Sequence, residues 1–151
     1  MSASSGSGPV VFAYDGSDLA KLAIDEAGRQ LGPGRDALVV CVWQPFDVGF
    51  VPPAGFQLNA QQATDVNKAA QHTAAEGASL AEAAGFRAQS VAIEGAPAWK
   101  EIVKLADERD ASVIVLGSHG RTGIADVLLG SVAGAVAAHS RRTVLISHRR
   151  P

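Results

Sequence analysis

Five short apolar segments, rich in β-branched residues, alternate along this chain with longer segments whose apolar residues recur at helical spacing. Apolar runs of about four to eight residues bounded by turn residues are typical of buried strands. Strands that alternate with helices form a parallel sheet covered by helices on both faces. The sequence therefore predicts one α/β domain, doubly wound around a five-stranded, mostly parallel sheet.

The expected boundaries follow from residues that begin or stop helices. Ser17 or Asp18 can cap the first helix, and glycine or proline punctuates the others. The expected strands are Val10–Tyr14, Ala37–Trp43, Ala88–Ile93, Ala111–Leu116 and Thr143–Ser147. The expected helices run from the cap to Leu31, from Ala60 to Ala84, from Pro97 past Ala106, and from Ser131 to His139. A loop rich in proline, glycine and aromatic residues covers Gln44 to about Leu58.

The carboxyl ends of the strands are the expected place for a ligand. Right-handed crossovers restrict how such a sheet is wound, and ligands bind where the strand order reverses. The first and fourth strands can be neighbours at that point. Asp15 and the loop at Gly117 would then form the opposite lips of one crevice.

Two glycine-containing turns separate the fourth strand from the last helix. They are Leu116-Gly-Ser-His-Gly-Arg121 and Gly130-Ser-Val-Ala133. Glycine lets the backbone approach a ligand closely or adopt positive φ. The N–H groups of the first helical turn are unsatisfied, and a helix N-terminus carries partial positive charge. The arrangement predicts a site for an anion such as a phosphate.

Composition excludes several classes of protein. The chain is 47% hydrophobic and 19% charged, which is typical of a folded globular protein, and its net charge of −2 gives no nucleic-acid footprint. No apolar run approaches the roughly 20 residues of a membrane span. The single cysteine, Cys41, excludes an internal disulfide and favours a reducing, cytoplasmic compartment. We expect residues 1–9 to be a disordered leader, 10–148 the domain and 149–151 a tail.

Several segments in order resemble the ATP-binding branch of the universal stress protein family. Its fingerprint is Gly-x-x-Gly, nine residues, then Gly-Ser or Gly-Thr; the chain has Gly117-x-x-Gly120 and, after nine residues, Gly130-Ser131. The strand ending Tyr14-Asp-Gly-Ser17 also matches, as does Gly95-x-Pro97 with the segments that follow it. The resemblance extends from about Val10 to His148. It implies a Rossmann-like fold, a cofactor of ATP with Mg²⁺, and a role in the stress response as a module responsive to stress or energy state.

The same resemblance implies roles for individual residues. Ser131 and the first-turn N–H groups would hold the phosphates, with Arg121 near the phosphate tail, and Asp15 would lie near the adenine and ribose. The expected nucleotide-binding residues are Ala13, Asp15, Val42, Leu116, Gly117, Ser118, His119, Gly120, Arg121, Gly130, Ser131, Val132 and Ala133. The resemblance also implies a homodimer joined through the last strand, Thr143 to Ser147, an apolar edge open to pairing.

Each of these residues also has a purely structural interpretation. The glycines can serve only tight turns, Ser131 can simply cap its helix, and Asp15 can be a turn-former. His119 is expected to be a solvated loop residue without a catalytic role, and Asp126 a solvated carboxylate rather than a metal ligand. No catalytic residue and no metal site is therefore assigned.

Turnover is not expected from this sequence. There is no Gly-x-x-x-x-Gly-Lys-Ser/Thr motif, and none of the four lysines lies in the glycine loop. Phosphoryl transfer needs a positioned cation, a metal ligand and a residue that orients the nucleophile. The leading hypothesis is a binding module with little or no turnover. The alternatives are a dimeric interaction protein of the same fold that binds no nucleotide, and a very slow ATPase.

The sequence leaves several points open. It does not separate ATP from AMP or a cyclic nucleotide, and it names neither the stress nor the downstream partner. The loop from Trp43 to Phe56 is unusually apolar for a connection. It can pack over the sheet edge, or it can serve as a lid or partner surface.

Overall fold

The computed structural model describes residues 8–44, 60–119 and 129–149. Strands and helices alternate throughout, as the periodicity predicts. In order, the elements are β1 (Val10–Ala13), α1 (Asp18–Leu31), β2 (Asp36–Trp43), α2 (Ala60–Ala83), β3 (Arg87–Glu94), α3 (Ala98–Glu108), β4 (Val113–Gly117), α4 (Ser131–His139) and β5 (Thr143–Ser147). Among these elements, no helix is long and apolar enough to cross a membrane.

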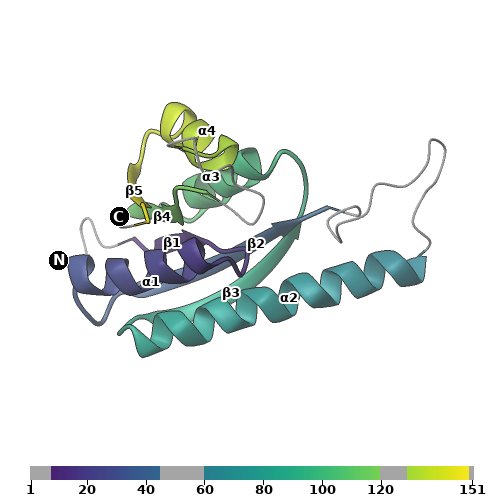
Figure 1. The fold of residues 1–151 in the computed structure, drawn as a ribbon, viewed down its shortest axis with the longest axis horizontal. Coiled ribbons are helices and arrows are strands. Elements are labelled where there is room, and N and C mark those ends of the chain that lie inside the picture. Colours follow the sequence, from purple (N-terminus) through teal and green to yellow (C-terminus); the bar gives the residue numbers. More distant parts are fainter. Residues whose placement is uncertain (1–7, 45–59, 120–128, 150–151) are drawn as a thin grey trace.

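The five strands form one sheet in the order β3-β2-β1-β4-β5 (Figure 1). Every pairing in it is parallel, so the sheet is wholly rather than mostly parallel. The strand order reverses at β1, which pairs with β2 on one side and with β4 on the other. The expected neighbourhood of the first and fourth strands is confirmed, with Val10 opposite Val113 and Phe12 opposite Val115.

Helices cover both faces of the sheet (Figure 1): α1 and α2 lie on one face, and α3 and α4 on the other. Side chains of a strand alternate between the two faces, and β1 illustrates the consequence. Phe12 packs in the core under α1 and α2, whereas Val11 packs in the core under α3 and α4. Both side chains are at most 1% exposed. Because β1 is buried on both sides, its sequence is continuously apolar.

Most helix ends follow the sequence signals, with small shifts. Ser17 rather than Asp18 caps α1, because its Oγ accepts a hydrogen bond from the Ala20 N–H at 3.2 Å. Gly85, with φ of +105°, follows the end of α2. Pro97 was expected in the first turn of its helix, but it stands one position earlier as the N-cap of α3. β4 begins at Val113 rather than Ala111, and it includes Gly117.

Some expectations concern parts of the chain outside the described residues. The leader up to residue 7, most of the apolar loop that follows Trp43, and the last two residues are among them. At the inner end of the leader, the Pro9 carbonyl accepts a hydrogen bond from the Ser112 N–H at 3.0 Å. Pro9 is therefore bound to the residue that precedes β4.

We predict that alanine substitutions at two helical glycines have opposite effects on stability. A Cβ at Gly77 of α2 would lie 2.7 Å from both Tyr14 Cδ2 and Val39 Cγ1, whereas a Cβ at Gly134 of α4 would meet nothing within 4 Å. Gly77→Ala should lower the free energy of unfolding by about 1–3 kcal/mol through overpacking. Gly134→Ala should raise it by about 0.5–1 kcal/mol through helix propensity. Urea denaturation compares the two; a stabilised Gly77→Ala protein would contradict the packing of α2 on β1 and β2.

Candidate functional site

Two turns meet at the carboxyl edge of the sheet, where the strand order reverses. One follows β1 and contains Asp15, Gly16 and Ser17; the other begins at Gly117 and Ser118, at the end of β4. Parallel neighbours carry both turns to the same edge, so they lie on either side of the reversal point. Asp15 and the loop at Gly117, the two segments expected to face each other, therefore both lie at this edge.

The turn after β1 is held by its own side chains. The Ser17 N–H donates to Asp15 Oδ1 at 3.0 Å, and Gly16 has φ of +84°, a conformation that favours glycine. Ser17 in turn caps helix α1 through its side chain. Asp15 is therefore a turn-former, as its structural interpretation expects. Its side chain remains partly exposed at the sheet edge.

Gly117 is required by close packing rather than by positive φ. Its φ is not in the left-handed region, but a Cβ there would lie 2.9 Å from Leu19 Cβ and 3.0 Å from the Leu19 carbonyl oxygen. The start of α1 thus lies directly against the end of β4. A larger residue would separate the two turns that form the site.

Ser118 joins three segments at this edge. Its N–H donates to the Ser147 carbonyl at 2.8 Å, and its own carbonyl accepts from the Gly130 N–H at 2.6 Å. Gly130 is thereby held beside the end of β4, although 12 positions separate it from Ser118 in the sequence. A Cβ on Gly130 would lie 3.1 Å from the Ser118 oxygen, so glycine suits this close approach.

Helix α4 begins at this contact without a side-chain cap. Its N-cap is Gly130, and Ser131 is the first helical residue and is exposed. The suggestion that Ser131 simply caps the helix is therefore wrong. The first-turn N–H groups of Ser131, Val132 and Ala133 have no partners within the helix. They leave donors at an end that carries partial positive charge.

His119 differs from the solvated loop residue that was expected. Its ring is half-buried, with Nδ1 at 3.2 Å from Ser118 Oγ. Within the described part of the chain, its Nε2 atom is buried and makes no hydrogen bond, and the same holds for Ser147 Oγ. An unsatisfied buried polar atom costs about 1–3 kcal/mol. Such atoms mark a place where a water molecule or a ligand can supply the missing partner.

The apolar residues expected in the site share one cluster. Leu116 and Ala133 are buried in the core under α3 and α4, and Ala13, Val42 and Val132 pack against it as partly buried side chains. They come from β1, β2, β4 and α4, so the topology brings them together from distant parts of the sequence. Gly120, Arg121 and Asp126 lie outside the described residues.

A contact that sequence reasoning missed lies on the other face of β1. The Tyr14 hydroxyl donates a hydrogen bond to Glu76 Oε1 of α2, and the tyrosine is 3% exposed. The residues are 62 positions apart, and no local pattern in the sequence relates them. Burial raises the pKa of Tyr14, and the acceptor Glu76 with the nearby Asp15 and Cys41 raises it further. The phenol therefore remains a hydrogen-bond donor in mildly alkaline solution.

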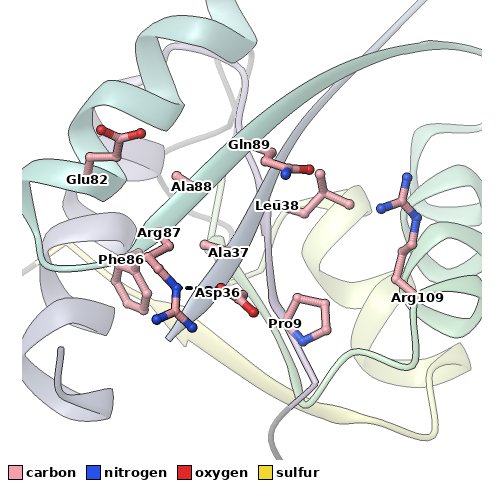
Figure 2. A pocket seen from close by; sticks show the side chains of 10 residues that line it. All are labelled: Pro9, Asp36, Ala37, Leu38, Glu82, Phe86, Arg87, Ala88, Gln89 and Arg109. Atoms are coloured by element: carbon pink, nitrogen blue, oxygen red, sulfur yellow. Dashed lines mark hydrogen bonds and ion pairs between the residues drawn. The ribbon is translucent and has the colours of Figure 1, made fainter. Parts of the chain in front are cut away.

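A separate hollow of about 630 Å³ lies away from the carboxyl edge (Figure 2). That hollow is at the amino ends of the strands, beside the paired starts of β2 and β3. Asp36 and Arg87 form an ion pair of 2.8 Å there, with side chains 61% and 73% exposed, and Arg109 lies across from them. Ligands of open parallel sheets bind at the carboxyl edge, so we place the candidate site there. In the ranges the structure describes, no three His, Cys, Asp or Glu residues are grouped to hold a metal.

We predict that the phenol of Tyr14 does not ionise until the protein unfolds. Tyr14 is the single tyrosine of the chain, so tyrosinate absorbance reports on it alone. Folding raises the pKa of Tyr14. The buried, protonated phenol therefore contributes its full share to the free energy of unfolding at pH values below the pKa of an unfolded tyrosine, about 10. That contribution is lost as the pH rises above this value. In Glu76→Gln, the Tyr14 phenol should ionise at a lower pH than in the parent protein, because a neutral acceptor repels the phenolate less.

Glu82→Gln is the matched control for that titration, since Glu82 is an exposed carboxylate on the same helix. Its tyrosinate transition should follow the parent. Ionisation of the parent near pH 10, with circular dichroism still native, would contradict the burial and bonding of Tyr14.

Comparison with known proteins identifies what the chain is similar to. The sequence model of the universal stress protein family matches residues 7–148. Universal stress protein MJ0531 of Methanocaldococcus jannaschii is 32% identical over 141 residues, which is 91% of this chain and 79% of that protein. MJ0577 of the same organism is 38% identical over 69 residues, 46% of this chain and 42% of that protein.

A universal stress protein of Mycolicibacterium smegmatis is 32% identical over 147 residues, 94% of this chain and 46% of that protein. The chain thus spans less than half the length of this relative.

Solved structures agree on the architecture. The structure of MJ0577 has a TM-score of 0.74 and 23% identity, with 96% of this chain and 98% of that one covered, and this likeness concerns the fold alone. A universal stress protein in complex with cAMP has a TM-score of 0.66 and 29% identity, with 93% and 96% covered. The predicted Rossmann-like α/β fold is therefore confirmed.

Proposed function

This chain belongs to the universal stress protein family, and we propose that it binds an adenine nucleotide at the carboxyl edge of its sheet. The form we expect is ATP with Mg²⁺. One observation carries the proposal: helix α4 begins at Ser131, and its N-cap Gly130 provides no side-chain cap and lies directly beside the end of β4. First-turn N–H groups that lack partners favour an anion, and a phosphate is the anion that nucleotides provide.

The donor set at this edge fits a phosphate group. The N–H groups of Ser131, Val132 and Ala133 can donate to phosphate oxygens, and the exposed Ser131 hydroxyl can add another hydrogen bond. The buried Nε2 of His119 lies without a partner in the described chain. Gly130 lets the start of α4 lie close to Ser118 and His119, which a Cβ would push apart. In the proposal, these groups hold the phosphates, and the family resemblance adds Arg121, which lies outside the described residues.

The other end of the crevice suits a nucleoside. Ala13 and Val42 are partly buried apolar side chains of neighbouring strands, on the face covered by α3 and α4. A flat base can rest on such a surface. The Asp15 carboxylate lies at the end of β1, where it can accept hydrogen bonds from a ribose or a base. A related universal stress protein has been solved in complex with cAMP, which supports an adenine nucleotide as ligand.

We further propose that binding, not turnover, is the activity. No lysine lies in the glycine loop, and the chain lacks the motif with which P-loop enzymes hold the transferred phosphate. The protein would then act as a cytoplasmic module of the stress response whose bound form reports stress or energy state. We also propose a homodimer through β5, an edge strand of the sheet with partly buried Val144 and Ile146.

The nucleotide proposal predicts saturable binding of Mg·ATP near one site per chain by titration calorimetry, and its loss in Gly130→Asp. Aspartate is a good N-cap, so α4 should form. Its carboxylate would repel a phosphate at the first turn of α4, and its Cβ, 3.1 Å from the Ser118 oxygen, would widen the junction with β4. Ser140→Asp, at the C-cap of the same helix, carries the same change of charge and should leave affinity unchanged. Undiminished binding in Gly130→Asp would contradict the site, and a flat titration of folded parent protein would contradict the proposal.

The dimer proposal predicts a concentration-dependent mass in analytical ultracentrifugation. Val144→Lys places a charge on the β5 edge and should shift the protein toward monomer. Ser90→Lys, an exposed position of the opposite edge strand β3, is the matched control and should not. A parent protein that stays monomeric at all accessible concentrations would rule the dimer out.

A further inference from the structure

The end of β1 presents two consecutive residues to two different environments. Tyr14 lies in the core under α1 and α2, whereas the next residue, Asp15, is partly exposed at the edge proposed to bind the nucleoside. The Tyr14 N–H donates to the Val40 carbonyl at 2.9 Å, so the pairing with β2 continues up to this point. Any restraint on the Tyr14 side chain therefore acts one residue away from Asp15.

Helix α2 supplies that restraint from the far face of the sheet. Glu76 accepts the hydrogen bond of the Tyr14 hydroxyl, and the α2 backbone lies so close to the ring that a Cβ on Gly77 would be 2.7 Å from Tyr14 Cδ2. One turn earlier, Thr73 Cγ2 lies 3.6 Å from the place of a Cβ on Gly16. The stretch of α2 from Thr73 to Gly77 thus lies beside the residues on both sides of Asp15.

We propose that the Tyr14–Glu76 hydrogen bond is a positioning contact that fixes Asp15 for the nucleoside end of the ligand. The inference rests on the proposed function, and it adds a determinant located on the opposite face of the sheet. Neither Tyr14 nor Glu76 touches the ligand in this account. They act through the backbone of the turn, whose geometry sets the direction of the Asp15 carboxylate.

The hydroxyl is not needed to fill space, which separates positioning from packing. Phenylalanine has the same ring, so Tyr14→Phe preserves the packing of the ring in the core cluster that includes Val39. Glu76 is exposed and is resolvated by water when its partner is removed. The substitution therefore leaves no buried atom unsatisfied, and its cost to stability should be small. An effect on binding would come from the altered position of the turn.

Calorimetry with two ligands tests the inference. Tyr14→Phe and Glu76→Ala should each weaken ATP binding about 3- to 10-fold, the equivalent of one modest hydrogen bond. Glu76→Gln retains an acceptor and should recover part of the affinity. Inorganic tripolyphosphate should bind all these variants as it binds the parent, because the phosphate end of the site is built on α4. Equal ATP affinity in Tyr14→Phe and parent would overturn the inference.

A double mutant tests whether Tyr14 affects ATP binding by positioning Asp15. In an Asp15→Asn background, Tyr14→Phe should cause little further loss of ATP affinity, since the carboxylate it positions is already gone. If the two substitutions lowered ATP affinity additively, Tyr14 would not act through Asp15 and the inference would be overturned. Phe86→Leu is the packing control: Phe86 is buried against Phe12, with ring centroids 5.2 Å apart, and should lower stability but not affinity.

Hydrogen exchange distinguishes failure of this inference from failure of the proposed function. The Ser17 N–H is bonded to the Asp15 carboxylate, so its exchange reports the order of the turn without any ligand. Faster exchange in Tyr14→Phe than in Phe86→Leu supports the positioning contact. Unchanged exchange in Tyr14→Phe overturns it, even if the parent protein binds no nucleotide.

Discussion

The parallel pairing of β1 with β4 is the constraint on which the rest of the structure depends. It places the reversal of strand order in the middle of the sheet, where β1 is buried on both faces. It also brings two turns from distant parts of the sequence to one edge. Gly117 then allows α1 to approach the end of β4, because a side chain there would collide with Leu19. Without this pairing, the two turns would not lie at one edge of the sheet.

The turn after β4 and the turn after β1 are stabilised in different ways. In the proposed site, the first belongs to the phosphate end and the second to the nucleoside end. The lip after β4 is held by backbone hydrogen bonds, in which Ser118 joins Ser147 to Gly130. The lip after β1 is held by side chains, through Asp15 on one face and Tyr14 with Glu76 on the other. In the proposed site, the first presents the first-turn N–H groups of α4 to an anion. In the proposed site, the second positions the Asp15 carboxylate near the apolar side chains of Ala13 and Val42.

Much of this fold follows from local sequence signals. Alternating apolar runs predict the order of strands and helices, and the Ser17 cap and Gly85 mark helix ends because their chemistry is local. Boundaries such as Pro97 and Val113 differ by one or two residues, since helix starts and strand ends depend on hydrogen bonds that periodicity does not contain. The glycine fingerprint identifies the residues after β4, but it does not show that Gly117 serves packing against α1.

What could not be predicted depends on contacts between distant segments. Glu76 has no signal in the sequence, because its role arises only when α2 packs under β1. The partial burial of His119 arises in the same way, from the junction of β4, β5 and the start of α4. Such residues become visible only when tertiary packing is known. They are also the residues most informative about how the site is held together.

Backbone amide chemical shifts during a titration with Mg·ATP test the central claim most directly. The account predicts saturable shifts at the first turn of α4, at Gly117 and Ser118, and in the turn from Asp15 to Ser17. Residues that line the hollow at the amino ends of the strands, such as Arg87 and Arg109, should remain unchanged. Shifts confined to that amino edge, or no shifts at all in folded protein, would contradict a nucleotide site at the reversal of strand order.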